Sequence, residues 1–189
     1  MQDLKNLGIS KGEMNMQVLV LRFDYKLSTK LEHDSKDLHL ASRRGNETQM
    51  PPHISLFSFE KINPATLKEQ VNKWIEQQKQ LDISFSSLGF FKQTGTFFVA
   101  PVVTKELETF HRELFSLISH LHTIEISPYL PGKWVPHSTL INKVPLTAWG
   151  PLFQRASLAF EPQSGKAVAL ECWSIVNGHA QTEWTYFLK

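Results

Sequence analysis

The chain has 189 residues, 41% of them hydrophobic, including thirteen phenylalanines and five tryptophans. That composition can fill a large core, which excludes a globally disordered protein. The formal net charge of +2 is too small for nonspecific nucleic-acid binding over the whole surface, so any anionic ligand has to be held by local groups.

Patterns for secretion and membrane insertion are absent from the sequence. Residues 1–15 carry Lys5 and Lys11 without an apolar core of signal-peptide length, and we interpret them as a polar N-terminal extension. No apolar run approaches the roughly 20 residues that a membrane-spanning helix needs. The single cysteine, Cys172, cannot form an internal disulfide, which suits a reducing compartment. We therefore expect a cytoplasmic protein with no membrane partner, built as one domain over residues 16–189.

The first half of that domain is predicted to alternate strands and helices. Residues 16–25 alternate in the manner of a half-buried strand, with Val18, Val20, Arg22 and Asp24 opposite Leu19, Leu21, Phe23 and Tyr25. Ser28 is expected to cap the next helix, and Asn63-Pro64 is a favourable helix start. The expected elements are strand 16–25, helix 28–41, strand 52–59, helix 63–79 and strand 81–92.

The second half is predicted to repeat this order. Thr104 opens a helix with a continuous apolar stripe, whereas two prolines and a glycine keep residues 127–134 from being helical. Residues 96–176 thus reproduce the element order of 16–92, which predicts a pseudo-twofold arrangement. The expected elements are strand 96–103, a helix from 104, strand 135–142, helix 147–158, and strands 166–176 and 182–188.

Two matching pentapeptides stand at equivalent places in these halves. Residues 52–56 read Pro-His-Ile-Ser-Leu and residues 136–140 read Pro-His-Ser-Thr-Leu, with the histidines 84 positions apart (137 − 53). In a strand, a histidine and a hydroxyl two residues later point to the same face. One such tripeptide alone is uninformative, because a strand histidine is often a core residue. Two copies with shared flanks, at one place in a repeat, favour a function.

The chemistry of the four side chains indicates phosphodiester cleavage or formation. Histidine titrates near 6.5, so one imidazole can accept a proton while the other donates one. We therefore predict His53 and His137 as the acid–base pair, and Ser55 and Thr139 as donors of hydrogen bonds to phosphate oxygens. No metal is needed for this chemistry, and no cofactor is expected. The side chains alone do not assign which histidine is the acid.

The paired motifs resemble those of the two-histidine (2H) phosphoesterase superfamily, which groups 2′-5′ RNA ligase-like proteins with cyclic phosphodiesterases. The resemblance covers about residues 16–188, and Ser55 stands where threonine is commoner in the family. It implies an α+β, bilobal fold in which two pseudo-symmetric β-α-β-α-β lobes, with antiparallel-rich sheets, flank a central catalytic cleft. It also favours His53 as the acid and His137 as the base.

The function implied is a phosphodiesterase that acts on RNA ends or nucleotides with a 2′,3′-cyclic phosphate or a 2′-5′ linkage. RNA end-joining by the same residues and a non-catalytic RNA- or nucleotide-binding module remain as alternatives. A monomer is expected, because the sequence has no coiled-coil pattern.

Candidate substrate-binding residues lie near both motifs. Lys133 and Trp134 precede the second motif, and Trp134 or Tyr129 could stack on a base. Arg43 precedes the first motif and could reach a phosphate, although a solvated loop is the simpler interpretation. Phe91 and Trp184 are expected in the core. A metal site is not expected at His111, His120 and His122, because no acidic or cysteine partner stands at ligand spacing.

Overall fold

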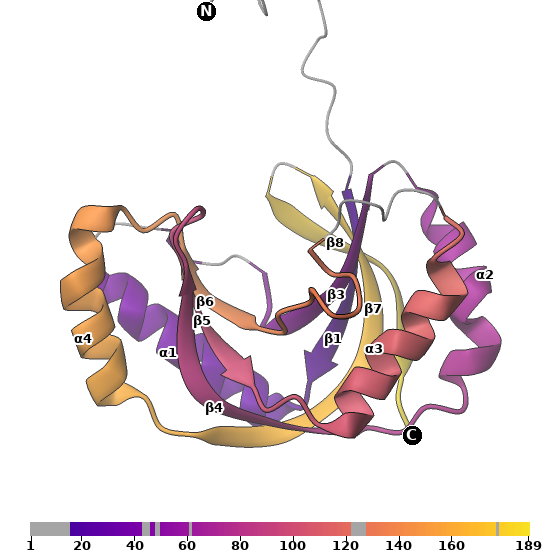
Figure 1. Cartoon of the computed structure of the whole chain (residues 1–189), viewed down its shortest axis with the longest axis horizontal. Helices are drawn as coiled ribbons and strands as arrows, with labels where there is room; N and C mark the ends of the chain where they lie inside the picture. Colours follow the sequence, from indigo (N-terminus) through magenta and orange to yellow (C-terminus); the bar gives the residue numbers. More distant parts are fainter. Residues whose placement is uncertain (1–15, 43–45, 48–49, 61, 122–127, 177) are drawn as a thin grey trace, which may run out of the picture.

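The structure is a computed structural model that describes residues 16–42, 46–47, 50–60, 62–121, 128–176 and 178–189. Strands form a bent central layer, with helices gathered toward both ends of the long axis (Figure 1). The elements are β1 (Met16–Phe23), α1 (Tyr25–Ser42), β2 (Asn46–Glu47), β3 (His53–Glu60), α2 (Pro64–Ile75), β4 (Leu81–Phe91), β5 (Thr96–Pro101), α3 (Lys105–Ile118), β6 (Ser138–Asn142), the 3₁₀ helix η1 (Leu146–Ala148), α4 (Trp149–Ala159), β7 (Gln163–Val176) and β8 (His179–Phe187).

The strands of the described residues form one hydrogen-bonded sheet in the order β2-β6-β5-β4-β7-β1-β3, with β8 paired to β7. Every pairing is antiparallel. The long strands β4 and β7 join the two ends of the sheet. The first half of β4 pairs with β7 and its second half with β5, whereas the second half of β7 lies between β1 and β8.

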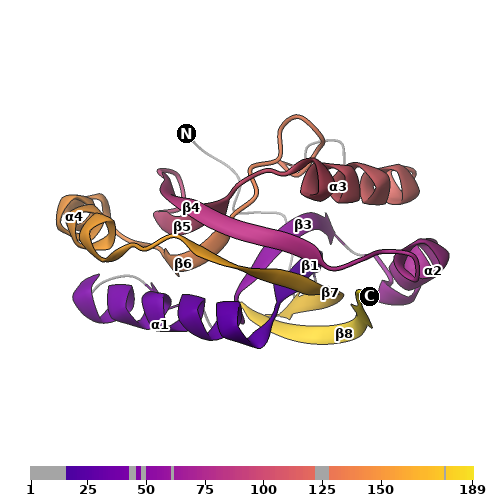
Figure 2. The same cartoon turned by 90° about the horizontal axis from the view of Figure 1, so that it is seen from below.

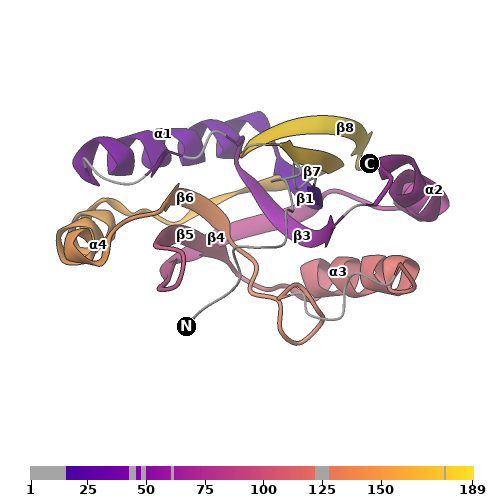
Figure 3. The same cartoon turned by 90° about the horizontal axis from the view of Figure 1, so that it is seen from above.

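The predicted α+β fold with two pseudo-symmetric lobes is confirmed. The sheet order is symmetric about the β4–β7 pair, with β5 and β6 on one side matching β1 and β3 on the other. The lobes are not the two halves of the sequence, however, because α1 and α3 each pack in the lobe opposite to the strand that they follow. Helix α1 follows β1 but packs on β6 and α4, and α3 follows β5 but packs with α2. Figures 2 and 3 show α1 with α4 at one end and α2 with α3 at the other.

The first strand is shorter than predicted, and the first helix starts earlier. Tyr25 was expected on the apolar face of the strand, yet it is the first helical residue and is 87% exposed. The cap is Asp24 rather than Ser28, because a side-chain oxygen of Asp24 accepts a hydrogen bond from the Leu27 amide at 2.9 Å. Leu27 and Leu31, on one face of this helix, are buried.

Two other helix starts agree with the sequence. The Asn63 side chain accepts a hydrogen bond from the Ala65 amide, and the Thr104 side chain accepts one from the Leu107 amide. The helix predicted over 147–158 is observed as η1 followed by α4, with Pro151 in the first turn of α4, where a proline is tolerated.

The strand of the second motif begins at Ser138, not at residue 135 as predicted. Its last pairs with β5 are Thr139 opposite Phe98 and Ser138 opposite Val99. Pro136 has no amide hydrogen to continue this ladder. His137 is therefore the residue just before the strand rather than part of it. No helix in the described parts of the chain is long and apolar enough to cross a membrane.

A matched pair of glycine substitutions tests the turn between β4 and β5. Gly95 has φ +62° and lies so close to Val144 that a Cβ would stand 2.4 Å from the Val144 carbonyl oxygen. Gly178 has φ +81° with open space around it. We expect Gly178→Ala to lower the free energy of unfolding by about 1–2 kcal/mol, and Gly95→Ala to cost about 1–3 kcal/mol more. Urea denaturation measures both. Equal losses of unfolding free energy in the two variants would mean that the close approach of Gly95 to Val144 does not limit the side chain at this turn.

Candidate active site

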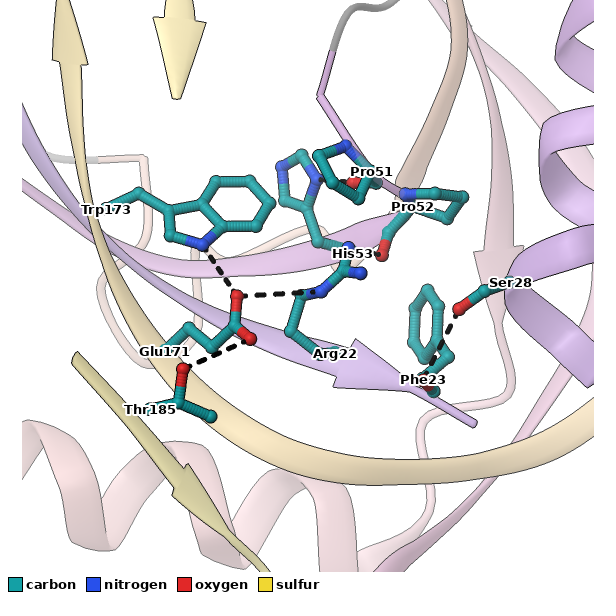
Figure 4. Close-up of polar contacts among 9 residues, drawn as sticks. All are labelled: Arg22, Phe23, Ser28, Pro51, Pro52, His53, Glu171, Trp173 and Thr185. Carbon is teal, nitrogen blue, oxygen red and sulfur yellow. Dashed lines mark hydrogen bonds and ion pairs between the residues drawn. The ribbon is translucent and has the colours of Figure 1, made fainter. Parts of the chain in front are cut away.

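The two motif histidines make the same backbone contact. Nδ1 of His53 lies 2.8 Å from the carbonyl oxygen of Pro51, and Nδ1 of His137 lies 2.7 Å from that of Val135. In each case the acceptor is two residues earlier, and a proline stands between. Figure 4 shows this contact for His53. The shared proline of the motifs therefore belongs to a local bend that turns a carbonyl back onto the ring.

This contact fixes the tautomer of both rings. A carbonyl oxygen can only accept a hydrogen bond, so Nδ1 must carry the proton in each imidazole. Nε2 is then left with its lone pair when the ring is neutral, or with a second proton when the ring is charged. Nε2 is thus the atom of His53 and of His137 that can accept or donate a proton.

Burial alternates along both motifs as predicted. Ile54 is fully buried and Ser138 is 1% exposed, whereas the histidine and hydroxyl on either side of each are only partly covered. Ser55 therefore shares a face with His53, and Thr139 shares one with His137. The hydroxyl of Ser138 points the other way and has no hydrogen-bond partner among the described residues.

The pKa values of the two histidines are displaced downward. Burial lowers the pKa of His53 to about 4, opposed by its bond to Pro51 and reinforced by the charges of Arg22 and His137. Burial also lowers the pKa of His137, opposed by its bond to Val135. Because a charge on His137 acts on His53, the two imidazoles lie within electrostatic reach of each other across the two motifs.

A hollow of about 380 Å³ opens beside the second motif. Its described lining includes His137 and Thr139 but neither His53 nor Ser55. The predicted substrate-binding residues of this region lie in the same lining: Tyr129, Lys133 and Trp134. A volume of this size suits a small-molecule ligand.

Two of these lining residues also touch the first motif. The indole nitrogen of Trp134 donates a hydrogen bond to the carbonyl oxygen of Ser55 at 3.0 Å. The phenol of Tyr129 hydrogen-bonds to the Ser55 side chain, and burial raises the pKa of Tyr129. The segment before the second motif is thereby joined to the first motif at both the backbone and the hydroxyl of Ser55.

The fold and the motifs agree with comparisons to known proteins. The sequence model of the 2′-5′ RNA ligase superfamily matches residues 28–179. The chain belongs to this superfamily. Its fold is similar to that of E. coli LigT crystallised with 3′-AMP, at TM-score 0.62 and 11% identity over 94% of this chain and 99% of LigT. It is also similar to TT0787 of Thermus thermophilus, at TM-score 0.63 and 12% identity over 93% and 98%. A comparison with curated proteins finds no match.

In this member of the 2′-5′ RNA ligase superfamily, His111 supports the candidate site by ring stacking, a role that was not assigned to it from sequence. His111 on α3 is 2% exposed and lies between two rings. It stacks on Trp134 at 3.9 Å with an interplanar angle of 3°, and on Phe57 at 4.6 Å with an angle of 12°. His111 thus covers one face of Trp134, so only the opposite face is available to a ligand. The stack connects α3 to both motif segments.

A polar cluster beside His53 was also missed from sequence. Arg22 on β1 stands directly opposite His53 in the β1–β3 register. Its Nη1 donates to the carbonyl oxygen of Pro52 at 2.7 Å, and its Nε lies 3.6 Å from a carboxylate oxygen of Glu171. Trp173 donates from its indole nitrogen to the same Glu171 oxygen at 2.7 Å and makes an edge contact with His53 at 4.7 Å between ring centroids (Figure 4). The strand alternation in the sequence predicted which face of β1 carries Arg22. It did not predict that His53, Glu171 and Trp173 lie next to it.

Three expectations about single residues have different outcomes. Phe91 was expected in the core, yet it lines the hollow and meets the ring of His137 edge-on at 4.9 Å. Trp184 is buried as predicted, and its indole nitrogen donates to the carbonyl of Pro64. Arg43 lies outside the described residues. Cys172 is fully buried, and burial raises its pKa to about 12, as for a structural thiol.

Proposed function

We propose that the protein is a metal-independent phosphodiesterase that hydrolyses 2′,3′-cyclic phosphate or 2′-5′ phosphodiester bonds in RNA ends or nucleotides. The observation that carries the proposal is the matching anchorage of the two motif imidazoles. Each is held by Nδ1 on a carbonyl, so His53 and His137 both offer Nε2 for proton transfer. One neutral and one protonated Nε2 are what acid–base cleavage of a phosphodiester requires.

With a 2′,3′-cyclic phosphate, the step is an in-line attack by water. The neutral imidazole takes a proton from water as the new P–O bond forms. The protonated imidazole gives its Nε2 proton to the ribose oxygen as the old P–O bond breaks. The product is a phosphate monoester, and the two histidines have exchanged their protonation states.

With a linear 2′-5′ linkage, the neighbouring 3′-hydroxyl replaces water as the nucleophile. The neutral imidazole takes the 3′-hydroxyl proton, and the protonated one gives its proton to the 5′-oxygen that leaves. The products are a 2′,3′-cyclic phosphate and a 5′-hydroxyl end. Reversing the same step joins the two ends, so hydrolysis and joining use one set of residues.

The hollow beside His137 is the place that we assign to the nucleoside. Trp134 lines this hollow and has one face covered by His111, and stacking of a base on the other face is worth about 1–3 kcal/mol. Lys133 belongs to the same lining, and its flexible side chain can bring the ammonium to a phosphate. Crystal structures of LigT hold 3′-AMP and ATP, and binding of a nucleotide by a protein of this fold supports the assignment.

The proposal is tested by incubating the purified protein with a 2′,3′-cyclic nucleotide and with 2′-5′- and 3′-5′-linked dinucleotides, each in excess EDTA. We expect turnover of the cyclic nucleotide or of the 2′-5′ dinucleotide at the same rate with and without chelator, because no proposed step passes through a metal. Product separation by chromatography identifies the bond that was cleaved.

Other outcomes of this experiment contradict the proposal in different ways. Loss of activity in EDTA would make the protein a metalloenzyme. Formation of a linkage from a 2′,3′-cyclic end and a 5′-hydroxyl end, without hydrolysis, would make joining its activity. Tight nucleotide binding without turnover of any of the substrates would leave a binding module on the same fold.

A further inference from the structure

The two motifs differ in the residue that the neighbouring strand places opposite the histidine. In the first half, Val20 of β1 stands opposite Ser55, and Arg22 stands opposite His53. In the second half, Phe98 of β5 stands opposite Thr139. The residue two positions further along β5 is Ala100, which is the pseudo-twofold counterpart of Arg22. The His53 side therefore has a guanidinium where the His137 side has a methyl group.

The position of Arg22 places its head group at the candidate active site. Residues directly opposite in an antiparallel pair point to the same face of a sheet, so Arg22 shares the face of His53. Figure 4 shows the guanidinium beside His53, with dashed lines to Glu171 and to the carbonyl oxygen of Pro52. Its side chain is 19% exposed, so it is neither sealed in the core nor free in solvent.

The contacts of Arg22 hold it in place but leave donors available. Nη1 binds the neutral carbonyl of Pro52, and Nε is 3.6 Å from Glu171, which is long for a hydrogen bond. Nη2 has no hydrogen-bond partner among the described residues. Glu171 is itself held by Trp173 and Thr185, and the guanidinium lies 5.6 Å from the centre of the Trp173 ring. This arrangement orients a cation whose remaining N–H groups can meet an anion.

We propose that Arg22 is the anion-binding residue of the His53 half of the cleft, where its guanidinium donates to an oxygen of the substrate phosphate. The inference rests on the proposed function, since it concerns the same bound phosphate. Arginine suits this task because its planar fork matches phosphate geometry. Together with the hollow on the other side, it orients the substrate: the nucleoside lies toward His137 and the phosphate charge lies toward Arg22.

Arg22 also acts on the protonation of its neighbour. Among the described residues, the charges that act on His53 are those of Arg22 on β1 and His137 of the second motif, and Glu171 on β7 is the ion-pair partner of Arg22. Arg22 and His137 lower the pKa of His53, so loss of the guanidinium charge must raise that pKa. A bound phosphate, which carries negative charge, must raise it as well. The charge of Arg22 thus adds to the effect of burial, which is the larger cause of the low pKa of His53, and a bound phosphate acts against both.

The test measures binding of inorganic phosphate by calorimetry, with no turnover required. We expect Arg22→Gln to raise the Kd for phosphate at least about tenfold, because a hydrogen bond to a charged group is lost. Arg155→Gln, which removes the same charge from the exposed face of α4, should leave the Kd unchanged. Arg22→Lys keeps the charge without the fork and should fall between wild type and Arg22→Gln. An unchanged Kd in Arg22→Gln would overturn the proposal.

A second experiment uses NMR to follow the Arg22 side chain during a phosphate titration and the His53 imidazole during a pH titration. In wild type, phosphate should shift the Arg22 side-chain NH resonance, and this readout decides the question even if Arg22→Gln does not fold. Absence of that shift at saturating phosphate would overturn the proposal. In Arg22→Gln, the His53 imidazole should titrate at higher pH than in wild type, and one limb of the pH–rate profile should move the same way. An unmoved His53 titration would contradict the electrostatic role.

The two proposals fail separately. If the protein binds phosphate through Arg22 but turns over none of the proposed substrates, the proposed function is wrong and the anion site stands. If turnover is normal in Arg22→Gln and phosphate binding is unaffected, the anion site at Arg22 is wrong and the proposed function stands.

Discussion

Alanine at His53 or at His137 is expected to lower kcat/KM for a 2′,3′-cyclic nucleotide by about 10²- to 10⁴-fold, the contribution of a positioned acid or base. Each substitution removes the Nε2 that the Nδ1 contact leaves free for proton transfer. The double variant should be little worse than the poorer single one, because residues that act as a unit are not additive. His179→Ala, on the exposed start of β8, is the matched control and should retain full activity.

The same variants can assign the acid and the base. We would compare them on a nucleoside 2′-phosphate p-nitrophenyl ester, whose leaving group departs without a proton near neutral pH. The variant that lacks the acid should be largely rescued on this substrate, whereas the one that lacks the base should stay slow, because the 3′-hydroxyl still needs deprotonation. Full activity in either single variant on the cyclic nucleotide would remove that histidine from the mechanism.

The part of this site that the sequence predicted depends on local geometry. The two-residue period of a strand was enough to place His53 with Ser55 and His137 with Thr139, while Ile54 and Ser138 point inward. The caps at Asn63 and Thr104 were predictable for the same reason, since a cap involves only its next few residues. The repeated element order likewise predicted a pseudo-twofold arrangement, whereas the two lobes were implied by the resemblance to the family.

The rest depends on contacts between distant segments. His111 was visible as a helical residue, but its burial comes from Phe57 and Trp134, which lie on β3 and on the segment before β6. The crossing of α1 and α3 to the opposite lobes has no signature in the order of elements. Strand alternation put Arg22 on the face opposite Leu21, but only the β1–β3 register sets it beside His53.

Loss of the motif hydroxyls should have the next largest effect. We expect Thr139→Val and Ser55→Ala each to lower kcat on the order of 10²-fold, as removal of one donor to a developing oxyanion does. KM should change much less, because the hydrogen bond strengthens as charge builds on the phosphate oxygens in the transition state. Steady-state kinetics on the cyclic nucleotide separate the two parameters.

The second motif contains its own control. Ser138 stands one residue before Thr139, is 1% exposed, and has a hydroxyl with no hydrogen-bond partner among the described residues. Ser138→Ala therefore removes a buried unpaired polar group from the opposite face of the strand. It should leave kcat unchanged and leave stability equal or higher, since an unpaired buried hydroxyl costs free energy. A strong loss of kcat in Ser138→Ala together with normal kcat in Thr139→Val would mean that the strand presents its other face to the substrate, and the acid–base geometry derived above would then be wrong.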